Sequence, residues 1–134
     1  MDLQEIAIKL SEHNQEGASF EAIILNGEQA VLQVVVEGFD ELPIYVTMTE
    51  EQILCMCYLL NSNELIEDKK SEFNDLLLRL NVAMPLSAFA MVEERYAIFG
   101  SLSSSSSFED IAHELVVLAD NAVDALESFE EFLN

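Results

Sequence analysis

Apolar residues recur along this chain with two different periods, and the changes between them predict the order of its elements. Residues 2–13 are predicted to form a helix, because their apolar side chains fall at helical spacing: Leu3, Ile6, Ala7 and Leu10. Asp2 is placed to cap this helix. Gly17 then breaks the pattern within residues 14–19.

Four strands are predicted next, in segments rich in β-branched and aromatic residues: 20–25, 31–37, 44–49 and 52–60. The fourth segment differs from an ordinary half-buried strand because both of its faces are apolar. Ile53, Cys55, Cys57 and Leu59 point one way, and Leu54, Met56, Tyr58 and Leu60 point the other. We therefore expect this strand to be covered on both sides, by helices on one side and by a second subunit on the other.

The remaining pattern predicts a second helix over residues 69–84, which Pro85 ends, and a hairpin formed by residues 86–92 and 96–100. A serine run at 103–107 is expected to be a loop whose last residue caps a final helix of about 25 residues starting at Phe108. The order α-β-β-β-β-α-β-β-α predicts one α+β domain over residues 1–134. It should contain an antiparallel sheet of about six strands with helices on one face.

The net charge of the chain limits the kinds of molecule that it is expected to bind. The chain has 26 acidic and 5 basic residues, for a formal net charge of -21, yet 51% of it is hydrophobic, so it is not a disordered acidic tail. The basic residues are scattered, which disfavours nucleic acid and anionic membrane as targets and favours a basic protein partner: Lys9, Lys69, Lys70, Arg79 and Arg95. No apolar run approaches the ~20 residues of a bilayer span, so membrane insertion is not expected. The first five residues do not resemble a signal peptide, so we expect a cytoplasmic protein.

Motifs for metal or catalytic chemistry are incomplete. His113-Glu114 begins like the zinc signature H-E-x-x-H, but Val117 occupies the position of the second histidine. Cys55 and Cys57 lie on one side of a strand without two further ligands in view, and core packing explains them better. The sequence therefore predicts no catalytic residue, no cofactor and no metal.

Apolar residues outside the main helical stripes indicate a partner or dimer surface instead. Leu78 and Val82 lie away from the apolar face of the second helix, and Val117 and Phe132 lie away from that of the last helix. Together with the second apolar face of the fourth strand, they predict a surface for a protein partner or a homodimer. The proposed surface consists of Leu54, Met56, Tyr58, Leu78, Val82, Val117 and Phe132.

Several segments resemble an uncharacterised bacterial family, the YjfI-like proteins. They are Phe73-Asn74-Asp75, Met84-Pro85-Leu86-Ser87, Phe99-Gly100 with the serine run, residues 42–54 and residues 125–130. The resemblance covers most of the chain and supplies no site residues. The element order is similar to that of the type III secretion chaperone-like fold, whose members are small, acidic, cytoplasmic, non-enzymatic and often dimeric. Family members also tend to be encoded near a relative of phage shock protein A, which implies a supporting role in a membrane-stress module.

The leading hypothesis is a non-enzymatic, acidic adaptor or chaperone-like protein that acts as a dimer and binds a basic or membrane-associated protein. One alternative is a small-molecule-binding protein or enzyme, for which Asn74 and Asn81 on a flank of the second helix are candidate pocket residues. Another alternative is an acidic decoy of a nucleic-acid-binding protein, because an acid-studded helix can imitate a row of phosphates.

Overall fold

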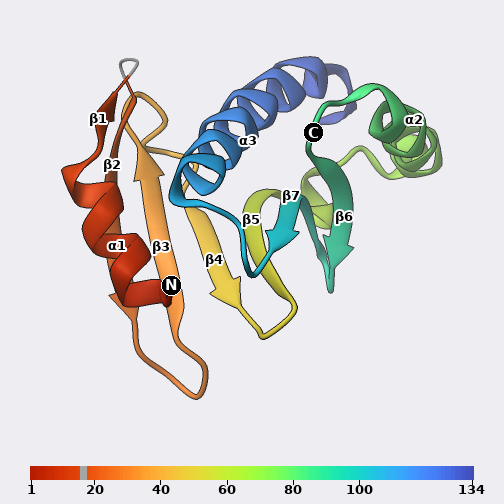
Figure 1. The fold of residues 1–134 in the computed structure, drawn as a ribbon. Helices are drawn as coiled ribbons and strands as arrows, with labels where there is room; N and C mark the ends of the chain where they lie inside the picture. The colour runs from red at the N-terminus through yellow and green to blue at the C-terminus, as the bar shows by residue number, and fades with distance from the viewer. Residues whose placement is uncertain (16–17) are drawn as a thin grey trace.

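The computed structural model describes residues 1–15 and 18–134 (Figure 1). Its helices are α1 (Leu3–Glu12), α2 (Lys70–Ala83) and α3 (Phe108–Ser128), with short 3-10 turns at Ser62–Glu64, Glu67–Lys69 and Glu130–Phe132. Its strands are β1 (Asn14–Gln15), β2 (Ala18–Leu25), β3 (Val31–Val36), β4 (Ile44–Met48), β5 (Gln52–Asn61), β6 (Ala88–Val92) and β7 (Arg95–Ser103). Apart from the two-residue β1, this is the order that the sequence predicts.

The strands form one antiparallel sheet in the order β1-β2-β3-β4-β5-β7-β6. The chain returns from α2 through a β6–β7 hairpin in which β7 pairs with β5, so β6 lies at the edge of the sheet. Residues of all three helices join one hydrophobic cluster with the strand residues that alternate toward them. The expected α+β fold, an open antiparallel sheet of about six strands with helices on one face, is confirmed.

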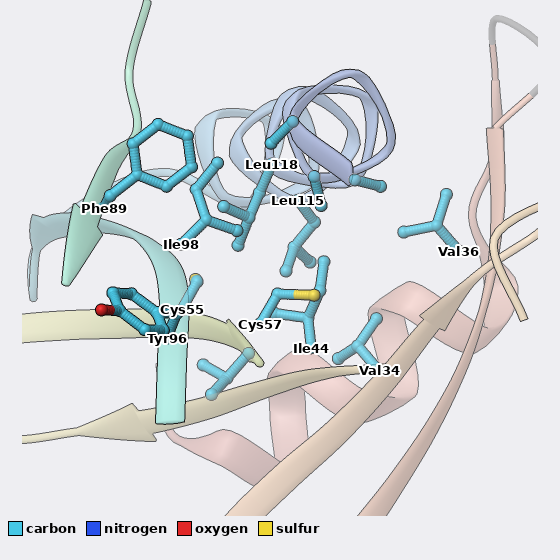
Figure 2. Packing of buried hydrophobic residues seen from close by; sticks show 14 of the residues in the cluster. Val34, Val36, Ile44, Cys55, Cys57, Phe89, Tyr96, Ile98, Leu115 and Leu118 are labelled. Carbon is cyan, nitrogen blue, oxygen red and sulfur yellow. The ribbon is translucent and has the colours of Figure 1, made fainter. Parts of the chain in front are cut away.

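The core lies between this inner face of the sheet and α3. Leu32, Val46 and Cys55 pair across three neighbouring strands and are buried, which is what a period of two residues requires of one face. Figure 2 shows such side chains gathered beneath Leu115 and Leu118 of α3. Cys55 and Cys57 are core residues, as expected, and burial raises the pKa of their thiols to about 12 and about 11. These thiols therefore stay protonated near neutral pH and are poor metal ligands and nucleophiles.

Two asparagines fasten α2 to the β6–β7 hairpin. The Tyr96 hydroxyl donates to Asn74 Oδ1 at 2.5 Å, and the Phe89 backbone N–H donates to Asn81 Oδ1 at 2.7 Å. Phe73, the residue before Asn74 on α2, packs edge-on against the Tyr96 ring. These contacts give both asparagines a structural role in joining α2 to the hairpin.

The element boundaries correct several details of the prediction. The final helix ends at Ser128 and continues only as the 3-10 turn Glu130–Phe132, so it is shorter than the apolar stripe suggested. β7 runs on to Ser103, which pairs with Gln52, so the serine loop begins one residue later than expected. β6 begins at Ala88 rather than at residue 86. The predicted break at Gly17 lies outside the described residues.

The predicted caps are confirmed. The Asp2 carboxylate accepts a hydrogen bond from the Glu5 backbone N–H at 2.9 Å, and the Ser107 hydroxyl accepts one from that of Asp110 at 3.2 Å. Each bond satisfies a backbone donor that the first helical turn leaves without a partner.

Candidate protein-binding surface

The outer face of the sheet is apolar, although no described helix packs on it. Among the 26 acidic residues of the chain, Glu21 is the only one within the strands that the structure describes. Register places Gln33, Tyr45 and Met56 side by side on this face, with Phe99 next in the row. Their side chains are half-buried among one another, whereas Ile23 is 58% exposed and Leu25 is 41% exposed. Exposed apolar faces of this kind are typical of contact surfaces in proteins.

A hollow of about 620 Å³ lies on this face and crosses several strands. Its apolar lining comes mainly from Leu25, Val31, Tyr45, Leu54, Met56 and Tyr58. The turn at Asn26–Gly27 borders it beside β2, and Arg95 borders it at the start of β7. The hollow is therefore an open groove with one cationic side chain.

Arg95 lies over the face of an aromatic side chain at this groove. Its Cζ is 3.6 Å from the centroid of the Tyr58 ring, and the Tyr45 ring centroid is 6.1 Å from that of Tyr58. The pairing of β5 with β7 is irregular between Tyr58 and Leu60, and such a bulge redirects side chains locally. A guanidinium in this position gains a cation–π attraction and leaves its edge free to donate hydrogen bonds.

Acidic residues surround the outer face at the ends of the strands. They lie in the turns between consecutive strands: Glu28, Glu37, Asp40, Glu41, Glu50, Glu51, Glu93 and Glu94. Glu37 also accepts a hydrogen bond from the Ser19 hydroxyl, which ties one turn to β2. The face is thus an apolar surface bordered by acidic side chains, and this arrangement attracts cationic segments to its edges.

A second surface coincides with the longest stretch of the chain that lacks an acid, residues 76–92 between Asp75 and Glu93. This stretch contains the second half of α2 and the edge strand β6. Four of its apolar side chains are exposed: Leu78 (70%), Val82 (91%), Leu86 (56%) and Met91 (49%). An edge strand leaves backbone donors and acceptors without partners, so it is a second reason to expect contact with another chain here.

The predicted surface residues fall into separate places. Leu54, Met56 and Tyr58 lie together on the outer face of β5, and Leu78 and Val82 are exposed one turn apart on α2. Val117, in contrast, is half-buried on α3, across the sheet from the outer face. These positions do not form one continuous surface.

Phe132 was wrongly assigned to that surface. Its side chain is only 5% exposed, and its ring packs edge-on against Phe73 with a centroid distance of 5.3 Å. The reason is the end of α3 at Ser128, because the following 3-10 turn rotates Phe132 into the core.

Sequence reasoning missed Tyr45 and Arg95. The sequence does contain a signal for Tyr45. It alternates with Ile44 and Val46, so this strand has apolar residues on both faces, as the fourth predicted strand has. The predicted hairpin of residues 86–92 and 96–100 leaves Arg95 in its turn, whereas Arg95 opens β7 and pairs with Val92 and Asn61. Nothing in its sequence neighbourhood indicates the contact with Tyr58.

Glu114 is a buried carboxylic acid that the sequence did not single out. It is 5% exposed, and its Oε1 has no hydrogen-bond partner among the residues that the structure describes. A Cβ at Gly100 would lie 1.9 Å from that oxygen, so the glycine provides the space that the carboxyl group occupies. Burial raises the pKa of Glu114, and the nearby His113 opposes this shift. Within residues 1–15 and 18–134, no group of three or more His, Cys, Asp or Glu side chains is arranged to hold a metal ion.

No helix in the described part of the chain is both long enough and apolar enough to cross a membrane. Among solved structures, the crystal structure of the ExsC–ExsE complex contains a chain with a similar fold, with a TM-score of 0.53 over 95% of this chain and 96% of that one. The two sequences are 14% identical, so this likeness concerns the fold alone.

Relatives by sequence are bacterial. The protein YjfI of Escherichia coli K12, described as uncharacterised, is 34% identical over 113 residues, which cover 81% of this chain and 83% of that protein. YjfI of Escherichia coli O157:H7 matches to the same extent. A family model described as "Uncharacterized protein conserved in bacteria (DUF2170)" matches residues 1–133. This chain therefore belongs to that bacterial family.

Proposed function

We propose that this protein is a non-enzymatic, chaperone-like protein that binds an apolar segment of another protein on the outer face of its sheet. The proposal rests on one observation. The described part of this face has an apolar groove and almost no acids, although the chain as a whole has a net charge of -21. A fold similar to that of a chain in the ExsC–ExsE complex is consistent with it. Fold likeness alone does not assign a function, so the proposal rests on the groove.

The partner segment should be apolar in its centre and basic at its flanks. The groove would bury the apolar residues, and acidic turns such as Glu50–Glu51 and Glu93–Glu94 would attract Lys or Arg on either side. Because the family resemblance implies a membrane-stress module, a membrane-associated partner fits this role. The proposal places the protein in the cytoplasm, where the buried thiols of Cys55 and Cys57 would remain reduced.

We also propose that the protein is a homodimer joined through residues 76–92. Two chains of charge -21 repel each other, and this acid-free stretch offers a contact with the least repulsion. On antiparallel α2 helices related by a two-fold axis, Leu78 of one copy would pack against Val82 of the other, and the reverse contact would form by symmetry. This arrangement leaves the groove on the outer face available to the partner.

The test is affinity capture from the native bacterium with the wild type and two variants, followed by mass spectrometry. Met56→Glu places an acid in the groove, whereas Ile8→Glu places one on α1, at a side chain that is 53% exposed. We expect a protein that the wild type and Ile8→Glu recover and that Met56→Glu loses, and its recovery should fall at high salt. Equal recovery with both variants would place the binding surface elsewhere and overturn the proposal.

A further inference from the structure

We propose that Arg95 recognises a carboxylate in the partner segment, at the end of the apolar groove. This inference rests on the proposed function and adds one acidic position to the partner segment that the groove binds. The segment would carry apolar residues along the groove and one Asp or Glu side chain where it reaches Arg95, in addition to its basic flanks.

Arg95 is available for such a contact. Two of the other cations are already paired with acids, Lys70 with Glu67 at 2.7 Å and Arg79 with Asp75 at 2.9 Å. Lys69 donates to a backbone carbonyl at 3.1 Å. In the described part of the chain, no carboxylate lies within 4.0 Å of the Arg95 guanidinium, despite the large excess of acids.

The acid next to Arg95 in the sequence, Glu94, is directed elsewhere. Glu94 Oε2 accepts a hydrogen bond from the Ser62 hydroxyl at 3.1 Å, and the Glu94 carbonyl accepts one from the Ser62 backbone N–H at 2.8 Å. Glu93 occupies the tight turn with a φ of 56°. The Tyr58 ring, at 3.6 Å, holds the guanidinium against the groove instead. A guanidinium oriented in advance loses less conformational entropy when it binds a carboxylate.

The position of Arg95 sets the length of the apolar part. The groove crosses from Leu25 on β2 to Arg95 on β7, which is four strand spacings away in the order of the sheet. At about 4.8 Å per spacing this is roughly 19 Å across the sheet. The groove also runs along the strands, because the row of Leu25 reaches β7 at Ser101, six residues or about 20 Å from Arg95. The diagonal is therefore roughly 28 Å, or about eight residues of extended chain. A bidentate contact between the guanidinium and a carboxylate would then fix the register of the bound segment.

The experiment is selection of a random peptide library displayed on phage against the full-length protein, with Arg95→Gln and Arg79→Gln selected in parallel. Both variants remove one positive charge, but Arg79 lies on α2 and is paired with Asp75. The wild type and Arg79→Gln should enrich apolar segments with an acid at one fixed position, whereas Arg95→Gln should enrich apolar segments without it. For a selected peptide, Arg95→Gln should weaken binding by about tenfold. Replacing the peptide acid by its amide should have the same effect on the wild type and no effect on the variant.

The outcomes separate the two proposals. Apolar segments without a fixed acid, or a fixed acid that persists with Arg95→Gln, would overturn the role of Arg95 and leave the groove as the binding surface. Failure to enrich any apolar segment would contradict both proposals. A melting curve of each variant shows that it is folded, and Arg95→Lys, which keeps the charge without the planar fork, should retain only part of the acid preference.

Discussion

The two faces of the sheet are built from the same strands and from similar residues, yet they have different surroundings. On β5, Ile53 and Cys55 are buried beneath the helices, whereas Leu54 and Met56, one residue away, are half-buried on the open face. Both faces are apolar, so hydrophobic content alone does not tell a core face from a contact face. Consecutive side chains of a strand point to opposite sides, and either side can therefore be covered by a different layer.

What separates the open face from the rest of the surface is the position of the acids. The exposed sides of the helices carry many of them, for example Glu109, Asp120 and Asp124 on α3, whereas the strands among residues 1–15 and 18–134 contain Glu21 alone. Residues 76–92 show the same property on a different part of the surface. On a protein this acidic, surface without acids indicates where another chain can approach.

The largest expected effect contrasts neighbouring residues of β5. Ile53→Ala removes buried methylene groups beneath the helices and should lower the free energy of unfolding by about 2–5 kcal/mol. Leu54→Ala, on the open face, should cost less than about 1 kcal/mol in the isolated protein, because its side chain keeps contact with solvent. Urea unfolding followed by circular dichroism measures both. Equal losses would mean that the outer face is already covered in solution.

The next effect concerns the acid-free surface on α2. Val82→Asp adds a charge at a side chain that is 91% exposed, so the fold should tolerate it. If two copies meet there, burying the new carboxylates should weaken the dimer at least about thirtyfold, by about 2 kcal/mol. Analytical ultracentrifugation over a range of concentrations measures this change. Ile8→Asp on α1 is the control, and the same dissociation constant for both variants would exclude α2 from the dimer contact.

Much of the fold could be predicted from the sequence because each element has a local signal. Asp2 and Ser107 begin helices through side chains three residues from their bonding partners, and short runs of mostly apolar residues mark β3 and β5. The failures depend on non-local contacts. Phe132 follows the helical stripe in sequence, but its burial is decided by packing against Phe73 from α2.

The binding surface was only partly predictable for the same reason. Leu54, Met56 and Tyr58 could be grouped because they share one strand. Tyr45 and Arg95 come next to them only because β4 and β7 pair with β5. The order of the elements along the chain does not show which strands pair. In the sequence, Glu114 stands out only as part of the incomplete H-E-x-x-H motif, and its position against Gly100 shows that it is buried.

The smallest expected effect concerns Glu114, which is buried between α3 and the inner face of the sheet. Its folded-state pKa is raised above the ordinary value of 4.5, mainly by burial, so the group favours folding when it is protonated. Stability from this group is therefore complete below pH 4.5 and is lost as the pH rises through the raised folded-state pKa. Glu114→Gln resembles the neutral acid and should raise the free energy of unfolding at pH 7, by on the order of 1 kcal/mol.

The difference between the variant and the wild type should be near zero at pH 4 and should grow toward neutral pH, because only the wild type then has to bury a charge. Urea unfolding of both proteins across this range measures it, and the subtraction removes the contribution of the surface acids that they share. Glu109→Gln, at an exposed position on α3, is the matched control for replacing one acid of this helix by its amide. A constant difference for Glu114→Gln at every pH would mean that the carboxylate reaches solvent, and that this part of the inner face is open as well.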